Sequence, residues 1–202
     1  QVARIRQYLE DVGELDDTLW IVTSDHGELF FDKGLVTHGR TLYDAEARVP
    51  LLLHWPRGLE PEERSEPVSH LDIMPTIVEL LGVPPHPAFQ GRSFVSSRAG
   101  NEQVESPALF MNIQGLRFAD AIVCWPYKLI LDRTGEKQLL FNLKRDPSES
   151  TNILADHPEI TTRMAETLKR QLLAQLDYHT EKSKDLREKR YQPRLLSCPR
   201  LP

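Results

Sequence analysis

The sequence predicts an α/β protein in which βα units are followed by a small antiparallel sheet with a packed helix. Over residues 1–100, short apolar runs alternate with segments of helical periodicity, a pattern typical of βα units. Between residues 108 and 143, several short β-type runs follow one another with turn residues between them, as in an antiparallel meander. A long amphipathic segment comes next and is expected to form the packed helix.

The α/β part is expected to combine helices with buried strands. Its first helix has apolar residues at helical spacing and stops at Gly13, because glycine favours helix ends. A later helix is expected to begin at Asp72, whose side chain suits an N-cap, and to end at Gly82. The predicted segments are a helix over residues 1–13, strands over 19–24 and 49–55, and a helix over 72–82.

Composition and periodicity divide the chain into three parts. Residues 1–100 are expected to belong to an α/β domain and residues 101–177 to a small α+β subdomain. Its last helix is expected over residues 158–177, and residues 178–202 form a charged, flexible tail without periodicity. Because the chain opens in the middle of a helix with no strand before it, we expect it to be the later part of a longer protein.

The overall composition excludes several classes of protein. A hydrophobic content of 40% and a charged content of 27% are typical of a globular domain with a sizeable core. The net charge of −5 offers no basic face for nucleic acid, so no nucleic-acid partner is expected. The apolar runs are too short to cross a membrane, and no signal peptide is seen. The compartment stays open, because a signal would lie upstream.

Cysteine is rare in this chain. Cys124 and Cys198 are too few and too far apart in sequence to predict a disulfide framework or a cysteine-based zinc site. Cys124 follows an apolar run, so we expect it to behave as a small buried hydrophobic residue.

The candidate chemistry lies directly behind the first predicted strand. Asp25 and His26 follow the strand, Gly27 permits a turn, and His38 returns a dozen residues later. Ligands gather beyond the carboxyl ends of strands in open α/β sheets, and an oxygen with an imidazole nitrogen suits a divalent cation. An ordinary strand-end turn, capped by Asp25, would explain the same residues without a metal.

The order of the motifs resembles the second half of a sulfatase, a family of the alkaline-phosphatase-like superfamily. The similar segments cover roughly residues 1–175 and are Ser24-Asp25-His26-Gly27-Glu28, Thr37-His38-Gly39, Arg48-Val49-Pro50-Leu51, His70 to Thr76, Gln90-Gly91-Arg92-Ser93, Tyr127 to Ile130 and Asp146-Pro147-Ser148-Glu149. The resemblance implies the later part of an alkaline-phosphatase-like fold, a mixed sheet sandwiched by helices, and a hydrolase of sulfuric esters. Its substrate would be a small-molecule or carbohydrate sulfate ester.

The resemblance also implies roles for individual residues. Asp25 and His26 match the pair that completes the metal site, usually Ca²⁺, with Mn²⁺, Mg²⁺ and Zn²⁺ as alternatives because many sulfatases carry Asn where this chain has His26. His38 matches a position that faces the ester and binds an oxyanion or protonates the leaving alkoxide. A purely structural His38, which only holds its loop, is the competing interpretation.

The nucleophile of the family is not found in these 202 residues. Sulfatases use a formylglycine made within a Cys/Ser-x-Pro/Ala-x-Arg segment, and Ser197-Cys198-Pro199-Arg200 does not have that spacing. We therefore expect the formylglycine upstream, in a missing N-terminal half that acts as the partner of this chain. The alternatives are a phosphonate or phosphate ester hydrolase, a phosphoglycerol or phosphoethanolamine transferase of the same superfamily, and a non-catalytic sulfatase-like module.

Overall fold

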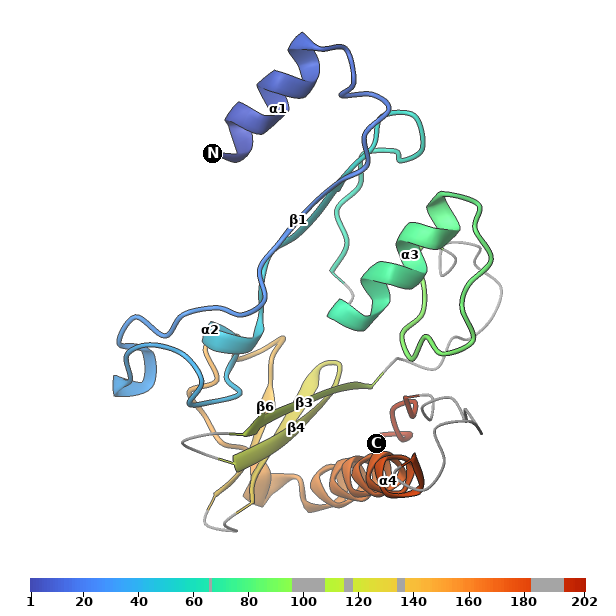
Figure 1. Cartoon of the computed structure of the whole chain (residues 1–202). Helices are drawn as coiled ribbons and strands as arrows, with labels where there is room; N and C mark the ends of the chain where they lie inside the picture. Colours follow the sequence, from blue (N-terminus) through green and yellow to red (C-terminus); the bar gives the residue numbers. More distant parts are fainter. Residues whose placement is uncertain (66, 96–107, 115–117, 134–136, 183–194) are drawn as a thin grey trace. The chain divides into compact units, whose positions relative to one another are not determined.

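A computed structural model describes residues 1–65, 67–95, 108–114, 118–133, 137–182 and 195–202, with only the backbone at 179–182 (Figure 1). The chain divides into two compact units, which are described separately. Unit 1 comprises residues 1–38 and 45–65, and unit 2 comprises residues 39–44 and 66–202. The predicted domain boundary between residues 100 and 101 and part of the predicted tail, residues 183–194, lie outside the described residues.

Unit 1 is built on an antiparallel pair of strands preceded by a helix. Trp20 lies opposite His54 and Thr23 opposite Leu51 in this pair. The first helix stops because Gly13 adopts a left-handed conformation (φ +75°) that a side chain disfavours. The predicted helix and both predicted strands are confirmed, with shorter bounds. The expectation that the strands are buried is wrong: every residue of Trp20–Thr23 and Leu51–His54 is half-buried or exposed, because the sheet that they form among the described residues has two strands only. The elements are α1 (Val2–Asp11), β1 (Trp20–Thr23), the 3₁₀ turn η1 (Asp32–Gly34), β2 (Leu51–His54) and the short helix α2 (Asp44–Ala47), which begins at the last residue of a unit 2 segment.

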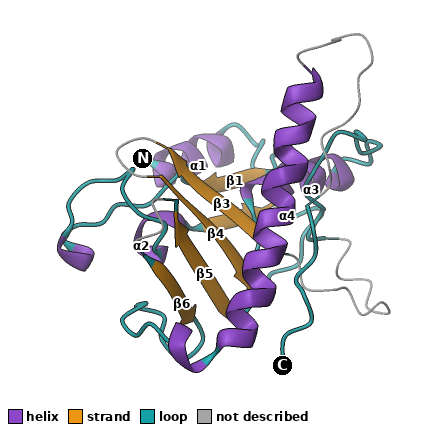
Figure 2. Cartoon of the chain, turned by 90° about the horizontal axis from the view of Figure 1, so that it is seen from below, coloured by secondary structure: helices purple, strands orange, loops and turns teal. Residues whose placement is uncertain are grey.

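Unit 2 contains a four-stranded antiparallel sheet whose strands follow in chain order, which confirms the predicted meander. The long helix α4 lies along one face of this sheet (Figure 2). Within the described residues, every helix is too short or too polar to cross a membrane. The elements are η2 (His70–Asp72), α3 (Ile73–Leu80), β3 (Leu109–Gln114), β4 (Phe118–Cys124), β5 (Tyr127–Asp132), β6 (Gln138–Asn142), η4 (Leu154–Asp156) and α4 (Pro158–Lys182).

The alternation of side chains along β4 gives unit 2 a core on each face of its sheet. Ile122 and Cys124 point toward α4, where Met164 and Leu168 pack against them. Ala121 and Val123 point to the other face, where Leu42 and Phe141 are among the buried residues. Both faces of the central strand are therefore covered, which explains why β4 is apolar throughout apart from Asp120.

The start of the second predicted helix differs from the expectation. Asp72 does not cap α3 through its side chain; its carboxylate accepts hydrogen bonds from the Ser69 N–H (2.8 Å) and the Arg92 N–H (2.9 Å). The 3₁₀ turn η2 precedes the helix, so the capping residue is Ser69, whose hydroxyl accepts from the Leu71 N–H at 3.2 Å. Asp72 is the reciprocal partner in this capping box.

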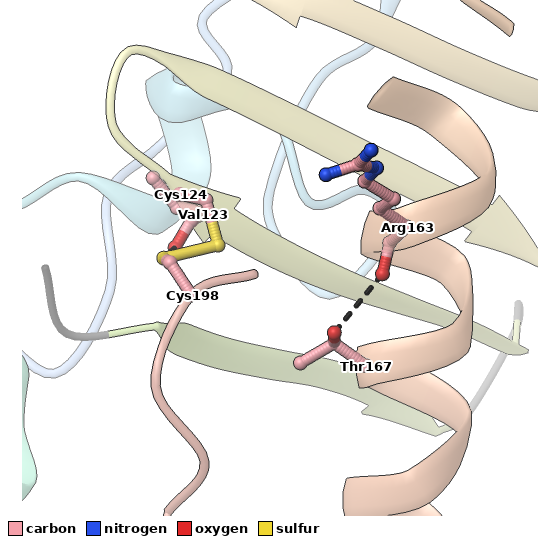
Figure 3. The surroundings of a disulfide bond; sticks show 5 residues. All are labelled: Val123, Cys124, Arg163, Thr167 and Cys198. Carbon is pink, nitrogen blue, oxygen red and sulfur yellow. Dashed lines mark hydrogen bonds between the residues drawn. A yellow bond between two sulfur atoms is a disulfide. The ribbon is translucent and has the colours of Figure 1, made fainter. Parts of the chain in front are cut away.

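The two cysteines form a disulfide, which overturns the expectation that they stand apart (Figure 3). Their Cα atoms are 5.5 Å apart although 74 positions separate them in sequence. Residues 195–202 also bind α4: the Leu196 N–H donates to Gln171 Oε1 (3.1 Å), and Arg163 donates to the Arg200 carbonyl (2.6 Å). This end of the predicted flexible tail is therefore attached to the domain, and α4 extends to Lys182 rather than to residue 177. The sequence did not predict this disulfide, because the two cysteines are distant in the chain and meet only where the fold brings the chain end back to β4.

A buried cation connects three segments of unit 2. The Lys128 side chain is fully buried, and its Nζ lies 2.7 Å from Asp44 Oδ1 and 2.9 Å from Glu149 Oε1. The second Glu149 oxygen accepts a hydrogen bond from the Asp44 N–H. Burial raises the pKa of the Glu149 carboxyl, and the nearby Lys128 charge opposes that rise. Such a buried cluster is favourable only when every charge keeps its partner.

Removing the cation alone should therefore destabilise unit 2. We expect Lys128→Met to lower the free energy of unfolding by about 3–5 kcal/mol, because two carboxylates lose their counter-charge. Denaturant titration followed by circular dichroism measures this loss. Lys128→Met combined with Glu149→Gln should recover a large part of it. The exposed Lys144→Met is the matched control; equal stability of the Lys128 and Lys144 variants would contradict the assignment.

The disulfide should likewise stabilise unit 2. Alkylation of the denatured, unreduced chain should label no thiol, whereas reduction should expose both. Cys198→Ala or reduction should cost about 2–5 kcal/mol of unfolding free energy, because a cross-link that closes a long loop restricts the unfolded chain. Calorimetry measures the change, with Ser197→Ala as the control in the same segment. Thiols that react without reduction would exclude the bond.

Candidate active site

The site begins where β1 ends at Thr23. The Ser24 hydroxyl donates to the His26 carbonyl at 2.7 Å, and Asp25 Oδ1 accepts from the His26 N–H at 3.0 Å. These local bonds stop the strand and turn the Asp25 carboxylate outward, where 87% of its side chain is exposed. The His26 N–H is the main cause that lowers the pKa of Asp25, so this carboxylate is ionised at neutral pH.

Gly27 is required here by a close contact rather than by a left-handed turn. A Cβ atom at this position would lie 2.3 Å from the Ala45 carbonyl oxygen, which is part of the backbone and cannot move aside cheaply. The Gly27 N–H also donates to the Glu46 carbonyl at 2.7 Å. The residue after His26 is thereby held against the segment that follows the site loop.

The His26 ring is oriented by its own turn. Its Nδ1 lies 2.8 Å from the Gly27 carbonyl, which can only accept, so Nδ1 carries the proton. This bond is the main cause that raises the pKa of His26, and the charge of Asp25 adds to the rise. Nε2 then lies 3.7 Å from Asp25 Oδ2. Histidines that bind metals are typically held in this way, with one nitrogen donating to a carbonyl and the other toward the ion.

Asp25 and His26 therefore fit a divalent cation by donor chemistry. One hard oxygen and one imidazole nitrogen lie close enough to reach the same ion. Among the described residues, no group of three or more His, Cys, Asp or Glu side chains is arranged to hold a metal. This part of the chain offers two ligands, fewer than a complete site needs.

His38 is brought to His26 across the intervening loop. The two rings lie 4.1 Å apart between centroids, with an angle of 31° between their planes. About half of the His38 side chain is exposed, and its Nδ1 lies 3.0 Å from Glu28 Oε2. The structure thus brings together the three residues singled out in the sequence, while their roles in metal binding and catalysis stay predictions.

Glu28 is the site residue that sequence reasoning missed. It belongs to the same motif as Asp25 and His26, but its neighbour His38 is ten positions away, so the pairing depends on the loop. The His38 ring is the main cause that lowers the pKa of Glu28. The only feature of the sequence that points to Glu28 as a site residue is its place in the Ser24–Glu28 motif.

The loop between Glu28 and His38 is closed at its base and strained at its tip. The Leu29 N–H donates to the Thr37 carbonyl at 3.3 Å, and Leu29 is buried. Between them, Phe30, Phe31 and Lys33 have positive φ values of 44°, 71° and 52°. Left-handed conformations of non-glycine residues cost about 1–2 kcal/mol each, and such strain clusters at functional sites.

Comparison with known proteins relates these residues to one family. The sequence profile of the sulfatase family matches residues 1–83. Arylsulfatase K of Bos taurus is 31% identical over 173 residues, which are 80% of this chain and 32% of that protein. Arylsulfatase K of Danio rerio is 33% identical over 165 residues, which are 75% of this chain and 31% of that protein. Choline-sulfatase of Rhizobium meliloti is 33% identical over 151 residues, which are 71% of this chain and 28% of that protein. The chain spans about a third of the length of these relatives.

Solved structures show the same fold. A protein solved in complex with its substrate D-glucosamine-2-N,6-O-disulfate has a TM-score of 0.74 at 23% identity, over 94% of this chain and 40% of that one. A putative sulfatase of Bacteroides thetaiotaomicron has a TM-score of 0.68 at 25% identity, over 94% of this chain and 42% of that one. The motif, the profile match and the shared fold agree: the chain belongs to the sulfatase family, within the alkaline-phosphatase-like superfamily.

Proposed function

We propose that this chain supplies one wall of the active site of a metal-dependent sulfuric ester hydrolase. The observation that carries the proposal is the grouping of Asp25, His26 and His38 behind β1, with the two imidazole rings 4.1 Å apart. The similarity to arylsulfatase K and choline-sulfatase supports sulfate esters as the substrate class.

Asp25 and His26 bind the metal in this proposal, through a carboxylate oxygen and through Nε2. Calcium is the favoured ion, and the nitrogen ligand also suits manganese or zinc. A divalent cation at this position would neutralise the charge of the ester oxygens. Asp25 is ionised and exposed, so it can bind an ion without first losing a proton.

His38 acts on the leaving group in this proposal. When the bond between sulfur and the ester oxygen breaks, its electron pair stays on the alkoxide oxygen. His38 donates a proton from Nε2 to that oxygen, because Nδ1 is engaged with Glu28. A protonated His38 also places a positive charge beside the ester oxygens before the bond breaks.

The nucleophile must come from outside these 202 residues, because no Cys/Ser-x-Pro/Ala-x-Arg segment occurs in them. We propose a formylglycine in an N-terminal part of the same polypeptide. The short span relative to the matched sulfatases supports this. Exposed apolar side chains on α1, among them Val2, Ile5 and Tyr8, offer a surface for such a part to cover. The 202-residue chain alone is expected to show no turnover.

The competing substrate is a phosphonate or phosphate ester. A phosphonate monoester hydrolase from Silicibacter pomeroyi shares the fold with a TM-score of 0.65. Matched aryl sulfate, aryl phosphate and phosphonate monoester substrates separate these candidates. Preferred turnover of the sulfate supports the proposal, and preferred turnover of either phosphorus ester replaces it.

Metal removal should abolish activity of the full-length protein. Treatment with a chelator is expected to stop ester hydrolysis, and added calcium should restore it, because the charge of the ester then has its counter-ion. Asp25→Asn should lower metal affinity by at least about tenfold in isothermal titration, since it removes an anionic ligand. If the chelator left the rate of ester hydrolysis unchanged, a role for a bound metal would be excluded.

His38 should matter most where the leaving group is poor. We expect His38→Ala to reduce kcat by about 10²–10⁴-fold on alkyl sulfates, the usual range for general acid catalysis. Activated aryl sulfates need little protonation, so their kcat should fall much less. Steady-state kinetics on both substrates measures the difference. An equal loss on both would show that His38 is not the acid.

A further inference from the structure

We propose that Glu28 is a positioning residue for His38: its carboxylate holds the Nδ1 proton and thereby directs Nε2 of His38 toward the ester. The role of His38 is that of the proposed function, on which this inference rests. Glu28 and His38 both belong to unit 1.

The distance between the two groups defines the proton arrangement. His38 Nδ1 lies 3.0 Å from Glu28 Oε2, a normal hydrogen-bond length. An ionised carboxylate can only accept, so the bond exists only when Nδ1 carries the proton. In the neutral ring Nε2 is then the basic nitrogen, and in the charged ring Nε2 carries the transferable proton.

The His38 ring is the main partner of the Glu28 carboxylate, and the Leu29 N–H is a weaker one. The second carboxylate oxygen, Oε1, is buried and makes no hydrogen bond with any described residue. About a third of the Glu28 side chain is exposed, compared with half of the His38 side chain. Glu28 is therefore less accessible to solvent than the imidazole that it contacts.

The loop backbone fixes the two partners before a substrate binds. The bond from the Leu29 N–H to the Thr37 carbonyl joins the residues directly after Glu28 and directly before His38. Leu29 is buried, which anchors that end of the loop. The hydrogen bond between His38 and Glu28 and the backbone bond between Leu29 and Thr37 together restrict the orientation of the His38 ring.

The neighbouring imidazole follows the same rule. His26 Nδ1 is held by the Gly27 carbonyl and His38 Nδ1 by Glu28, while the rings lie 4.1 Å apart. Two adjacent imidazoles therefore keep Nδ1 engaged with oxygen and leave Nε2 for chemistry. The acceptor is a backbone carbonyl for His26 and a carboxylate for His38.

A purely structural role predicts different behaviour. If the pair only closed the loop, its loss would reduce stability and would lower activity on every substrate by the same factor. A positioning role changes the tautomer of His38 and the dependence of kcat on the leaving group. Glutamine at position 28 should preserve the positioning role, because its amide oxygen is a neutral acceptor of similar shape.

The first test reads the tautomer directly. Nitrogen-15 NMR spectra of the 202-residue chain, at a pH where both rings are neutral, should show His38 with the proton on Nδ1. Glu28→Ala should move His38 toward the Nε2–H tautomer, and Glu28→Gln should retain the Nδ1–H form. Glu14→Ala, an exposed site in unit 1, is the control. An unchanged His38 tautomer in a folded Glu28→Ala variant would overturn the proposal, whatever the enzyme assays give.

The second test reads catalysis in the full-length protein. Glu28→Ala should lower kcat on an alkyl sulfate by about 10–100-fold with KM nearly unchanged, the usual effect of removing the partner of an active-site histidine. The loss on an activated aryl sulfate should be smaller, and Glu28→Gln should recover most of it. Equal losses on both substrates would overturn the positioning role. A tautomer change without any sulfatase activity would instead contradict the proposed function and leave the Glu28–His38 geometry standing.

Discussion

The close contact between Gly27 and the backbone of Ala45 and Glu46 is the constraint on which the candidate site depends. A side chain at residue 27 would collide with the Ala45 carbonyl, and the Gly27 N–H is bonded to the Glu46 carbonyl. Because this contact is made of backbone atoms, it defines the path of the chain immediately after His26. This contact therefore limits how the turn from Ser24 to His26 can present its carboxylate and its imidazole.

The site combines a rigid base with an exposed surface. The base consists of backbone bonds and of one side-chain hydrogen bond, between His38 and Glu28. Asp25 and about half of His38 remain exposed, so the groups that would meet a metal and an ester need not be uncovered first. Unit 2 uses other means for its stability: a buried Lys128 between two carboxylates, and a disulfide that attaches the chain end to β4.

Much of the fold could be predicted because it depends on local periodicity. The helices and strands follow from apolar spacing, and the meander follows from short β-type runs separated by turn residues. The candidate ligands Asp25 and His26 could be named because they directly follow a strand. The Ser69 cap could not, since it caps the 3₁₀ turn that precedes α3 and not α3 itself.

The sequence by itself determined the family, the order of the elements and the residue types that can carry chemistry. Each of these depends on patterns among residues that are close together in the chain. Tertiary structure alone decided which distant residues meet. It paired Glu28 with His38, stacked His38 on His26, joined Cys124 to Cys198 and placed Lys128 beside Asp44 and Glu149. Those contacts depend on loop closure and on the return of the chain to the sheet, which local sequence patterns do not encode.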